Sequence, residues 1–322
     1  MKVAIIGSNF GLRGYLPAIN KIKNLNVKII CSRNKNKIPF KKLEDFEHET
    51  NWKNIFKRNI DLIILAVPPK LQEEIILYNL KYKKKIIFEK PISSKYFISK
   101  KIVEKLKINK IKSEINLTYL SHPLFHKTKK IIDNKSLGKV INYKIYWDFV
   151  SSDFNKKIRS WKTDEKNGGG IKNIFLTHVL AYCEFFFNKI HLKESNIKFS
   201  KFKGLKYKKL ISIKLSNPGE VIGNVLISTK KNGLQTHKID INFKKGRAQL
   251  FTKSKDWTKN FVLKIYYNKT KKIKTYKIMH KKKFQDGRSH QIFQMLKNFL
   301  KRPNYENLEY CLNAEKLNKK IN

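Results

Sequence analysis

The sequence predicts an α/β protein with a doubly wound parallel sheet, followed by an α+β part with an open, mostly antiparallel sheet. Short apolar strand candidates alternate with helix candidates up to about residue 119, an order typical of parallel sheets. From residue 139 onward, alternating apolar and polar residues prevail, as in antiparallel sheets with one covered face. The length of 322 residues allows two cores, and we expect domains at 1–119 and 120–322.

The first part consists of short strand candidates linked by helix candidates. Strands are expected at 2–6, 27–31, 60–67, 85–88 and 115–119, and helices around 16–19, at 71–80 and at 94–107. The run 60–67 is almost wholly apolar and is followed by Pro68, which indicates a strand covered on both faces.

The second part begins with an extended segment at 139–149, and a helix follows Gly168-Gly169-Gly170 up to about residue 187. Further strands are expected at 207–215, 219–229, 236–243, 247–252, 260–267 and 272–279, and closing helices at 287–300 and 305–320. One face of this sheet should carry a helix, and the other should be exposed or paired with another subunit.

The net charge of +48 raises the question of a polyanionic partner. Only seven of the 72 basic residues are arginine, the side chain best suited to phosphate and guanine contacts. The lysines are spread along the whole chain, and joint enrichment in Lys, Asn and Ile is typical of coding from an A+T-rich genome. We expect no specific nucleic-acid partner, although a polyanion-binding protein stays open as an alternative.

Neither a membrane segment nor a metal site is expected. No apolar run approaches the ~18–20 residues that span a bilayer, and residues 2–6 indicate a first strand rather than a signal peptide. Cys31, Cys183 and Cys311 are odd in number and far apart, which suits neither a disulfide framework nor a zinc site. The expected location is the cytoplasm.

A glycine-containing turn joins the first strand to the first helix. A dinucleotide site needs a tight turn, close approach of the backbone to pyrophosphate and a free helix N-terminus. Gly7 supplies the turn, whereas Asn9 stands where a second glycine is usual and Leu12 takes the third position. The place between strand and helix favours a dinucleotide role over a plain turn. The residues expected to contact the cofactor here are Gly7, Ser8, Asn9, Phe10 and Gly11.

The end of the second strand bears on the choice between NAD and NADP. An acidic residue there would bind the ribose 2′-hydroxyl of NAD. This chain has Ser32 and Arg33 instead, a hydroxyl and a guanidinium that suit a 2′-phosphate. NADP is therefore favoured, and NAD stays open if Arg33 only stacks on adenine or faces solvent.

A polar trio, Glu89-Lys90-Pro91, follows the apolar run at 85–88. If that run is a parallel strand, the trio lies at its carboxyl end, where ligands bind in open α/β sheets. A lysine held beside other positive charge can have a lowered pKa and serve as a proton donor. The alternative is that the trio only opens a surface loop.

His178 lies in the apolar face of the helix that follows the triple glycine. A single histidine there is more often a core residue than a catalyst. The glycine run nevertheless allows a ligand to approach the backbone just before it. His178 would be catalytic only if it converges in space with Lys90.

The motifs occur in an order that resembles the glucose-fructose oxidoreductase / inositol dehydrogenase family of nicotinamide-dependent enzymes. They are the glycine turn, Ala66-Val67-Pro68-Pro69-x-x-Gln72, Glu89-Lys90-Pro91, Tyr119-Leu120-Ser121-His122-Pro123, Leu137-Gly138-Lys139-Val140, Arg159-Ser160-Trp161-Lys162, and Gly168-Gly169-Gly170 separated from His178 by seven residues. The resemblance implies a Rossmann domain, then an α/β domain whose open sheet commonly forms homodimers or homotetramers. It also implies sugars, sugar nucleotides, inositols or related polyols as substrates.

The resemblance further implies roles for particular residues. Lys90 and His178 would be catalytic, with Lys90 beside the nicotinamide and the reacting carbon. Glu89 would orient Lys90 or contact the nicotinamide ribose, and Pro91 would fix the loop. Further cofactor contacts would come from Ser32, Arg33, Ala66, Val67, Pro68, Gln72, Glu89 and Lys90. Substrate contacts would come from Lys90, Tyr119, His122, Arg159, Trp161, Lys162, Asn173 and His178.

Two positions depart from the family pattern. Many members have an aspartate four residues before this histidine, where the chain has Ile174, and many have histidine where it has Gln72. We therefore expect an NAD(P)-dependent oxidoreductase in which Lys90 carries more of the catalysis. A relative that binds nucleotide or sugar without turnover is the alternative.

Overall fold

The computed structural model describes residues 1–33, 46–151, 153, 160–202, 205–230, 232–256, 258–278, 284–301 and 305–321. Its contacts divide the chain into two compact units. The first comprises Met1–Thr118 and Lys282–Leu312, and the second comprises Tyr119–Lys281 and Asn313–Asn322. A segment near the C-terminus thus packs with the first unit, although it follows most of the second unit in sequence.

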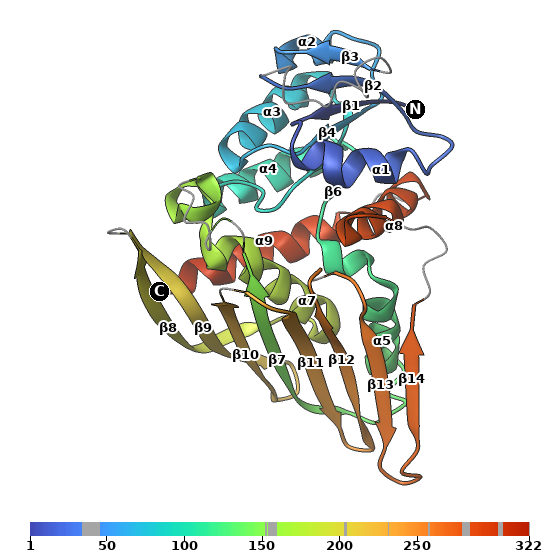
Figure 1. Ribbon diagram of the computed structural model, residues 1–322, viewed down its shortest axis with the longest axis vertical. Coiled ribbons are helices and arrows are strands. Elements are labelled where there is room, and N and C mark those ends of the chain that lie inside the picture. The colour runs from blue at the N-terminus through green and yellow to red at the C-terminus, as the bar shows by residue number, and fades with distance from the viewer. Residues whose placement is uncertain are drawn as a thin grey trace. The chain divides into compact units, whose positions relative to one another are not determined.

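The first unit contains a six-stranded parallel sheet in the order β3-β2-β1-β4-β5-β6 (Figure 1). Its strands are β1 (Lys2–Ile6), β2 (Asn26–Cys31), β3 (Glu47–Glu49), β4 (Leu62–Leu65), β5 (Lys85–Phe88) and β6 (Ser113–Ile115). The strand order reverses between β1 and β4, and in doubly wound sheets ligands bind outside the carboxyl ends of the strands at this switch point. The predicted doubly wound sheet is confirmed.

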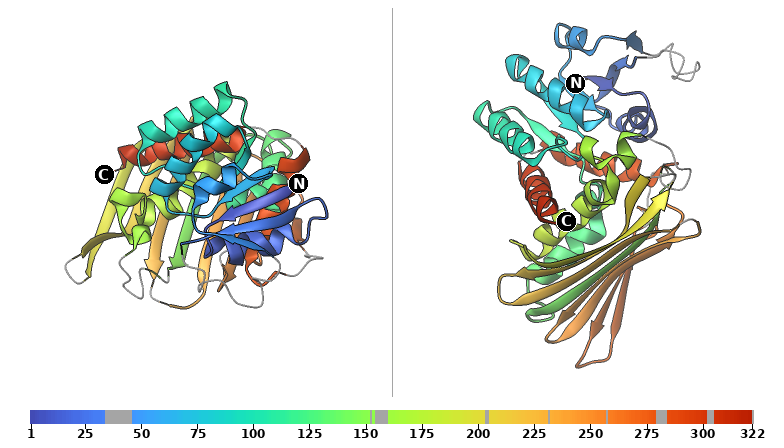
Figure 2. Two further views of the ribbon diagram at one scale, coloured as in Figure 1. Left: turned by 90° about the horizontal axis from the view of Figure 1, so that it is seen from above. Right: turned by 90° about the vertical axis from the view of Figure 1, so that its left-hand side faces the viewer.

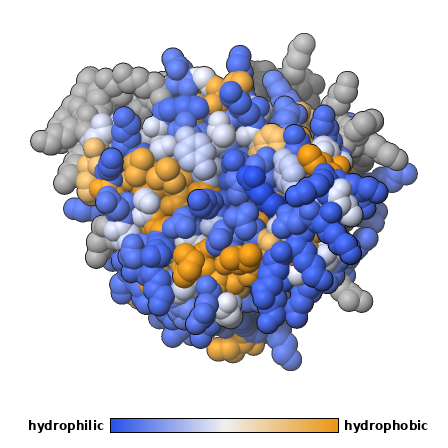
Figure 3. Space-filling view, turned by 90° about the horizontal axis from the view of Figure 1, so that it is seen from below, coloured by the Kyte–Doolittle hydropathy of each residue, from blue (hydrophilic) through white to orange (hydrophobic). Residues whose placement is uncertain are grey.

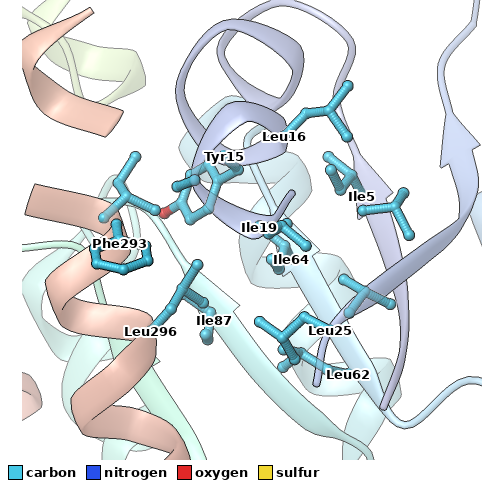
Figure 4. Close-up of a cluster of buried hydrophobic side chains, with 14 of the residues drawn as sticks. Ile5, Tyr15, Leu16, Ile19, Leu25, Leu62, Ile64, Ile87, Phe293 and Leu296 are labelled. Atoms are coloured by element: carbon cyan, nitrogen blue, oxygen red, sulfur yellow. The ribbon is translucent and has the colours of Figure 1, made fainter. Parts of the chain in front are cut away.

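Most helices of the first unit connect these strands, and α8 joins them from near the C-terminus. They are η1 (Gly11–Tyr15), α1 (Leu16–Ile19), α2 (Trp52–Phe56), α3 (Pro69–Tyr82), α4 (Tyr96–Ile108) and α8 (Gly287–Lys301). Helix η1 is a π-helical turn that continues into α1, and α8 packs against both. Figure 4 shows the resulting core, in which Phe293 and Leu296 of α8 lie near Tyr15 and near Ile87 of β5.

The second unit contains an eight-stranded sheet in the order β14-β13-β12-β11-β7-β10-β9-β8. Its strands are β7 (Val140–Val150), β8 (His191–Phe202), β9 (Leu205–Asn217), β10 (Val221–Lys230), β11 (Gln235–Phe243), β12 (Gly246–Ser254), β13 (Val262–Tyr267) and β14 (Ile273–Lys277). Among the strands that the structure describes in this sheet, only β7 and β10 pair in parallel, so the prediction of a mostly antiparallel sheet is confirmed.

One face of this sheet carries helices α5 (Pro123–Asp133) and α7 (Thr177–Phe187), as Figures 1 and 2 show. In β11 and in residues 246–252 of β12, every second residue is buried and its neighbours are partly exposed, which is the pattern of a sheet covered on one side. A second π-helical turn, η7 (Lys172–Leu176), leads into α7. The last helix is α9 (Glu306–Lys320). Among the described residues, no helix is both long and apolar enough to cross a membrane.

The structure corrects one expected strand and adds other elements. Strand β6 ends at Ile115, and Tyr119 lies in a 3-10 turn, η4 (Thr118–Ser121), rather than in a strand over 115–119. Strand β8 and helix α5 had no counterpart among the expected elements. Residues 193–196 of β8 are all exposed, so this edge strand has no apolar alternation that would indicate it.

Candidate active site

The turn after β1 requires glycine at two positions. Gly7 has φ of +111°, and a Cβ added to it would lie 2.3 Å from the carbonyl oxygen of Ala66, just after β4. A Cβ on Gly11 would lie 2.6 Å from Cγ2 of Ile5. These close approaches place the turn at the carboxyl ends of β1 and β4, at the switch point of the sheet.

The same turn has features that a pyrophosphate site needs. Helix η1 begins directly after Phe10, and none of residues 8–15 is acidic, so the positive end of the helix faces no carboxylate of its own turn. Asn9 is exposed and does not have a positive φ, so its conformation does not require the usual glycine. Ser8 and Phe10 are partly exposed beside it.

Ser32 and Arg33 lie at the carboxyl end of β2. The Ser32 hydroxyl lies 3.1 Å from Nε2 of His48, and Arg33 is exposed. Glu49 is the nearest acidic residue in β3, but its Oε1 accepts hydrogen bonds from the backbone of Thr50 and Asn51 at 2.8 and 2.9 Å. The latter bond is the main cause that lowers the pKa of this carboxyl. Glu49 is thus engaged with its own loop.

Ala66, Val67 and Pro68 follow β4 at the same edge of the sheet. Ala66 and Val67 are partly exposed, and the exposed Pro68 precedes the first turn of α3. Gln72 lies in that first turn and is buried, with its side-chain amide against the main chain of residues 89–92.

Glu89 is held by two neutral donors. Its Oε1 accepts a hydrogen bond from the Tyr15 hydroxyl at 2.7 Å and from Nδ2 of Asn116 at 2.8 Å. Burial raises the pKa of Glu89, while these two hydrogen bonds and the charges of Lys90 and Arg288 act in the opposite direction. Glu89 thus lies between Tyr15 of η1 and Asn116 at the end of β6.

Lys90 follows Glu89, is partly exposed, and is joined to Pro91 by a cis peptide bond. The trio Glu89-Lys90-Pro91 therefore lies at the carboxyl end of β5, next to β4 in the sheet.

Three residues near this loop were missed in the sequence: Tyr15, Asn116 and Arg288. Asn116 directly follows β6, so the rule that ligands gather at carboxyl ends of strands could have found it. The Arg288 guanidinium lies 4.4 Å from the centre of the Phe10 ring and is paired with Asp286, with Nη2 of Arg288 2.6 Å from Oδ2 of Asp286. No local pattern around residue 288 indicated this place.

In the second unit, Tyr119 belongs to a buried polar chain. Its hydroxyl lies 3.1 Å from Nδ1 of His237, and the Tyr182 hydroxyl lies 2.9 Å from Nε2 of the same ring. Trp147 stacks on His237 with a centroid distance of 4.6 Å. Burial lowers the pKa of His237 to about 3, so the ring is neutral between two hydroxyls.

His178 lies on this cluster. It is 4% exposed, and its ring meets Tyr119 edge to face at 5.6 Å. It follows the π-helical turn η7 in α7, and such turns are frequent at functional sites. Ile174, four residues earlier, offers it no carboxylate.

The other expected substrate residues differ in their surroundings. His122 is buried and its Nδ1 accepts a hydrogen bond from the backbone of Leu124 at 3.2 Å, which caps α5. Arg159 lies outside the described residues. Trp161 and Lys162 are partly exposed.

The triple glycine brings Trp161 and Asn173 together. A Cβ on Gly169 would lie 2.0 Å from the carbonyl oxygen of Trp161, and Nδ2 of Asn173 donates to the Gly169 carbonyl at 2.9 Å. The Lys162 ammonium lies 3.1 Å from Oδ2 of Asp153. Three of the expected substrate residues thus form one local cluster.

The chain is similar to several known proteins. An uncharacterized oxidoreductase of Schizosaccharomyces pombe is 27% identical over 113 residues, which covers 35% of this chain and only 30% of that relative's length. A crystal structure of KijD10, a 3-ketoreductase from Actinomadura kijaniata in complex with NADP and TDP-benzene, has a TM-score of 0.81 at 14% identity, covering 100% of this chain and 96% of that one.

Two other structures share the fold. A levoglucosan dehydrogenase in complex with NADH has a TM-score of 0.81 at 15% identity, with 100% and 95% of the two chains covered. An oxidoreductase from Agrobacterium radiobacter in complex with NAD+, L-tartaric acid and magnesium has a TM-score of 0.82 at 12% identity, with the same coverage.

Two family models match in sequence order. The oxidoreductase family with an NAD-binding Rossmann fold matches residues 1–113, and the C-terminal alpha/beta domain of the same oxidoreductase family matches residues 129–315. Together with the switch-point glycine turn and the loop at Glu89-Lys90-Pro91, these matches show that the chain belongs to the glucose-fructose oxidoreductase / inositol dehydrogenase family.

Proposed function

We propose that the chain is an NAD(P)-dependent oxidoreductase that acts on a secondary alcohol or ketone of a sugar, sugar nucleotide or polyol. The observation that carries this proposal is the Glu89-Lys90 loop, which follows β5 beside the switch point and is held by Tyr15 and Asn116. The bound nicotinamide would supply the hydride acceptor or donor. The protein would supply the proton and the position of the substrate.

Lys90 is proposed as the main acid/base. Its ammonium would polarise the substrate carbonyl and donate a proton to the oxygen during reduction, and it would accept that proton as the amine during oxidation. Glu89 would keep Lys90 oriented by its charge. Because Tyr15 and Asn116 donate to the Glu89 carboxylate, they favour its charged form against the effect of burial.

His178 is proposed as the second acid/base or as a partner of a substrate hydroxyl. Trp161, Lys162 and Asn173 are proposed to bind the substrate, together with Arg159. Tyr119 and His122 are buried, so we propose that they act by supporting the surrounding side chains.

NADP is the proposed cofactor, with NAD as the alternative. Arg33 is exposed at the end of β2, and Glu49 is engaged by its own loop. A guanidinium there suits a 2′-phosphate. Arg33→Ala should weaken NADPH binding about tenfold while NADH binding changes little, since one lost charged contact is worth ~1–2 kcal/mol.

We also propose a homodimer or homotetramer that pairs through the uncovered face of the eight-stranded sheet. Tyr146 on β7 lies on this face and is 38% exposed. Figure 3 shows hydrophobic residues in several patches between hydrophilic ones on the underside of the molecule.

A second candidate is a non-catalytic relative that binds nucleotide or sugar. The specific observation in its favour is Ile174, which leaves His178 without the carboxylate that many family members place there. Polyanion binding by the scattered lysines is a third candidate.

Cofactor binding and turnover separate these candidates. Quenching of tryptophan emission by NADPH or NADH supports the first two, and its absence from purified folded protein would contradict both. Turnover of a panel of sugars, sugar nucleotides and polyols is then compared between wild type and Lys90→Ala. This comparison distinguishes an enzyme from a protein that only binds the cofactor or sugar. Nucleic-acid affinity that survives physiological salt would support the third.

A further inference from the structure

We infer that Gln72 is a positioning residue that fixes the main chain on both sides of Lys90. This inference rests on the proposed function, because it concerns how the proposed acid/base is held. The family resemblance had placed Gln72 among the cofactor contacts. Its hydrogen bonds point to a different role.

The side chain of Gln72 spans the whole Glu-Lys-Pro loop. Its Nε2 donates to the carbonyl oxygens of Glu89 at 2.6 Å, Pro91 at 3.0 Å and Ile92 at 3.1 Å. Its Oε1 accepts a hydrogen bond from the backbone N–H of Glu89 at 2.9 Å. The residue is 1% exposed. Both polar atoms are therefore used on the loop, and the flanking residues of Lys90 are held from one point.

The position of Gln72 is itself fixed by its place after strand β4. Gln72 lies in the first turn of α3, and its backbone N–H donates to the Pro68 carbonyl at 2.9 Å. Pro68 follows β4, whereas the loop that Gln72 holds follows β5. Gln72 thus links the segments that follow the neighbouring strands β4 and β5, directly beside Lys90.

The hydrogen-bonding groups of the loop around this side chain are matched by an amide. The loop presents one N–H and three carbonyl oxygens, so the side chain must offer an acceptor and more than one donor. A neutral imidazole offers one of each and meets this demand in part. An aliphatic side chain of similar size meets none of it and leaves buried polar groups unpaired, which is costly.

Asn79 provides a matched control on the same helix. It is fully buried, its Nδ2 donates to the Lys84 carbonyl at 2.8 Å, and its Oδ1 accepts from the Lys84 backbone at 3.1 Å. It is seven residues beyond Gln72, about 10 Å along the helix. Replacing Asn79 therefore also removes a buried amide that is hydrogen-bonded to a loop, and this loop, at Lys84, precedes β5 and is remote from Lys90.

The experiment compares Gln72→Leu, Gln72→His and Asn79→Leu with the wild-type full chain. Thermal unfolding measures the loss of overall stability, and amide hydrogen exchange at Glu89 measures the protection of the loop backbone. Tryptophan quenching measures the Kd for NADPH. We expect both leucine variants to lower Tm by a similar amount. Only Gln72→Leu should lose protection at Glu89 and raise the Kd by about tenfold or more, and Gln72→His should recover part of both effects.

The outcomes distinguish this inference from the proposed function. A wild-type protein that binds neither NADPH nor NADH contradicts the proposed function and this inference with it. A wild type that binds NADPH, with Gln72→Leu binding equally well and keeping Glu89 protected, overturns only the role of Gln72. Equal losses of cofactor affinity in Gln72→Leu and Asn79→Leu would also overturn it, because they would reflect general destabilisation.

Discussion

Two regions differ in how they surround their polar groups: the Lys90 loop, Glu89-Lys90-Pro91, and the His178 cluster, which consists of His178, Tyr119, Tyr182, Trp147 and His237. Around Lys90 a carboxylate is kept and is surrounded by donors from Tyr15 and Asn116. The His178 ring contacts the Tyr119 ring, and the buried His237 next to Tyr119 is held neutral. The first region surrounds a buried carboxylate with donors, whereas the second holds a buried imidazole in its neutral form.

This difference bears on which residue carries proton transfer. A charged acid/base needs nearby partners that stabilise one of its two forms. Lys90 has Glu89 next to it in sequence, whereas the position four residues before His178 is Ile174. We therefore expect substitutions at the Lys90 loop to cost more activity than substitutions in the His178 cluster.

The largest effect is expected from Lys90→Ala. Loss of a general acid/base typically costs 10²–10⁴-fold, so turnover should fall by about 10³. Steady-state kinetics with a substrate from the sugar panel measures this. Lys70→Ala, on an exposed lysine of α3, is the control and should be neutral. Equal turnover in Lys90→Ala and wild type would remove the proposed mechanism.

A smaller effect is expected from Tyr15→Phe, which keeps the ring and removes the donor to Glu89. The hydrogen bond from Tyr15 lowers the pKa of Glu89, so its loss should raise that pKa further. The acidic limb of the pH profile of kcat/KM should move to higher pH, with about tenfold lower activity below it. Tyr78→Phe, which breaks a tyrosine pair on α3, should leave the profile in place. An unshifted profile in Tyr15→Phe would mean that Glu89 does not act through this bond.

His178 and Ile174 can be tested as a pair. In wild type, His178→Asn should cost about tenfold or less in kcat/KM. Ile174→Asp would put a carboxylate on the same helical face, raise the pKa of the imidazole and make the later loss of His178 larger. A double-mutant cycle measures this coupling. If His178→Asn costs the same in both backgrounds, the missing carboxylate does not explain the difference between the two regions.

The smallest effect on activity is expected from His237, which acts on stability. Burial lowers its pKa from 6.5 to about 3, so in that interval the unfolded chain binds more protons and stability falls as pH falls. The slope from this residue alone is roughly 1.4 kcal/mol per pH unit below the unfolded pKa. Urea unfolding of wild type and His237→Gln between pH 6.5 and pH 4 isolates it. Parallel curves for the two proteins would contradict a buried neutral His237.

Local patterns in the sequence were enough to predict where two motifs of the candidate site lie in the sheet. The apolar runs before Gly7 and before Glu89 predicted two strands of a parallel sheet, and the rule for carboxyl ends placed both motifs at one edge. The structure has them in β1 and β5 of the same sheet, with β4 between them. These are consequences of local periodicity and of strand order.

The partners of these residues could not be predicted, because they are far apart in sequence. Tyr15 is 74 residues from Glu89, and Tyr119 is 118 residues from His237. Arg288 reaches the glycine turn only because α8 packs against η1. Neither hydrophobic periodicity nor motif spacing in the sequence indicates such contacts, because they depend on tertiary packing.

Chemical rescue of Lys90→Ala tests the central claim most directly, because it asks whether the missing group is an amine at that place. Small primary amines such as methylammonium should restore part of the lost turnover of Lys90→Ala, in proportion to their concentration, and leave wild type unaffected. Rescue should follow the basicity of the amine, as expected for proton transfer. Turnover in Lys90→Ala that equals wild type, or a lost activity that no amine restores while NADPH still binds, would contradict Lys90 as the acid/base.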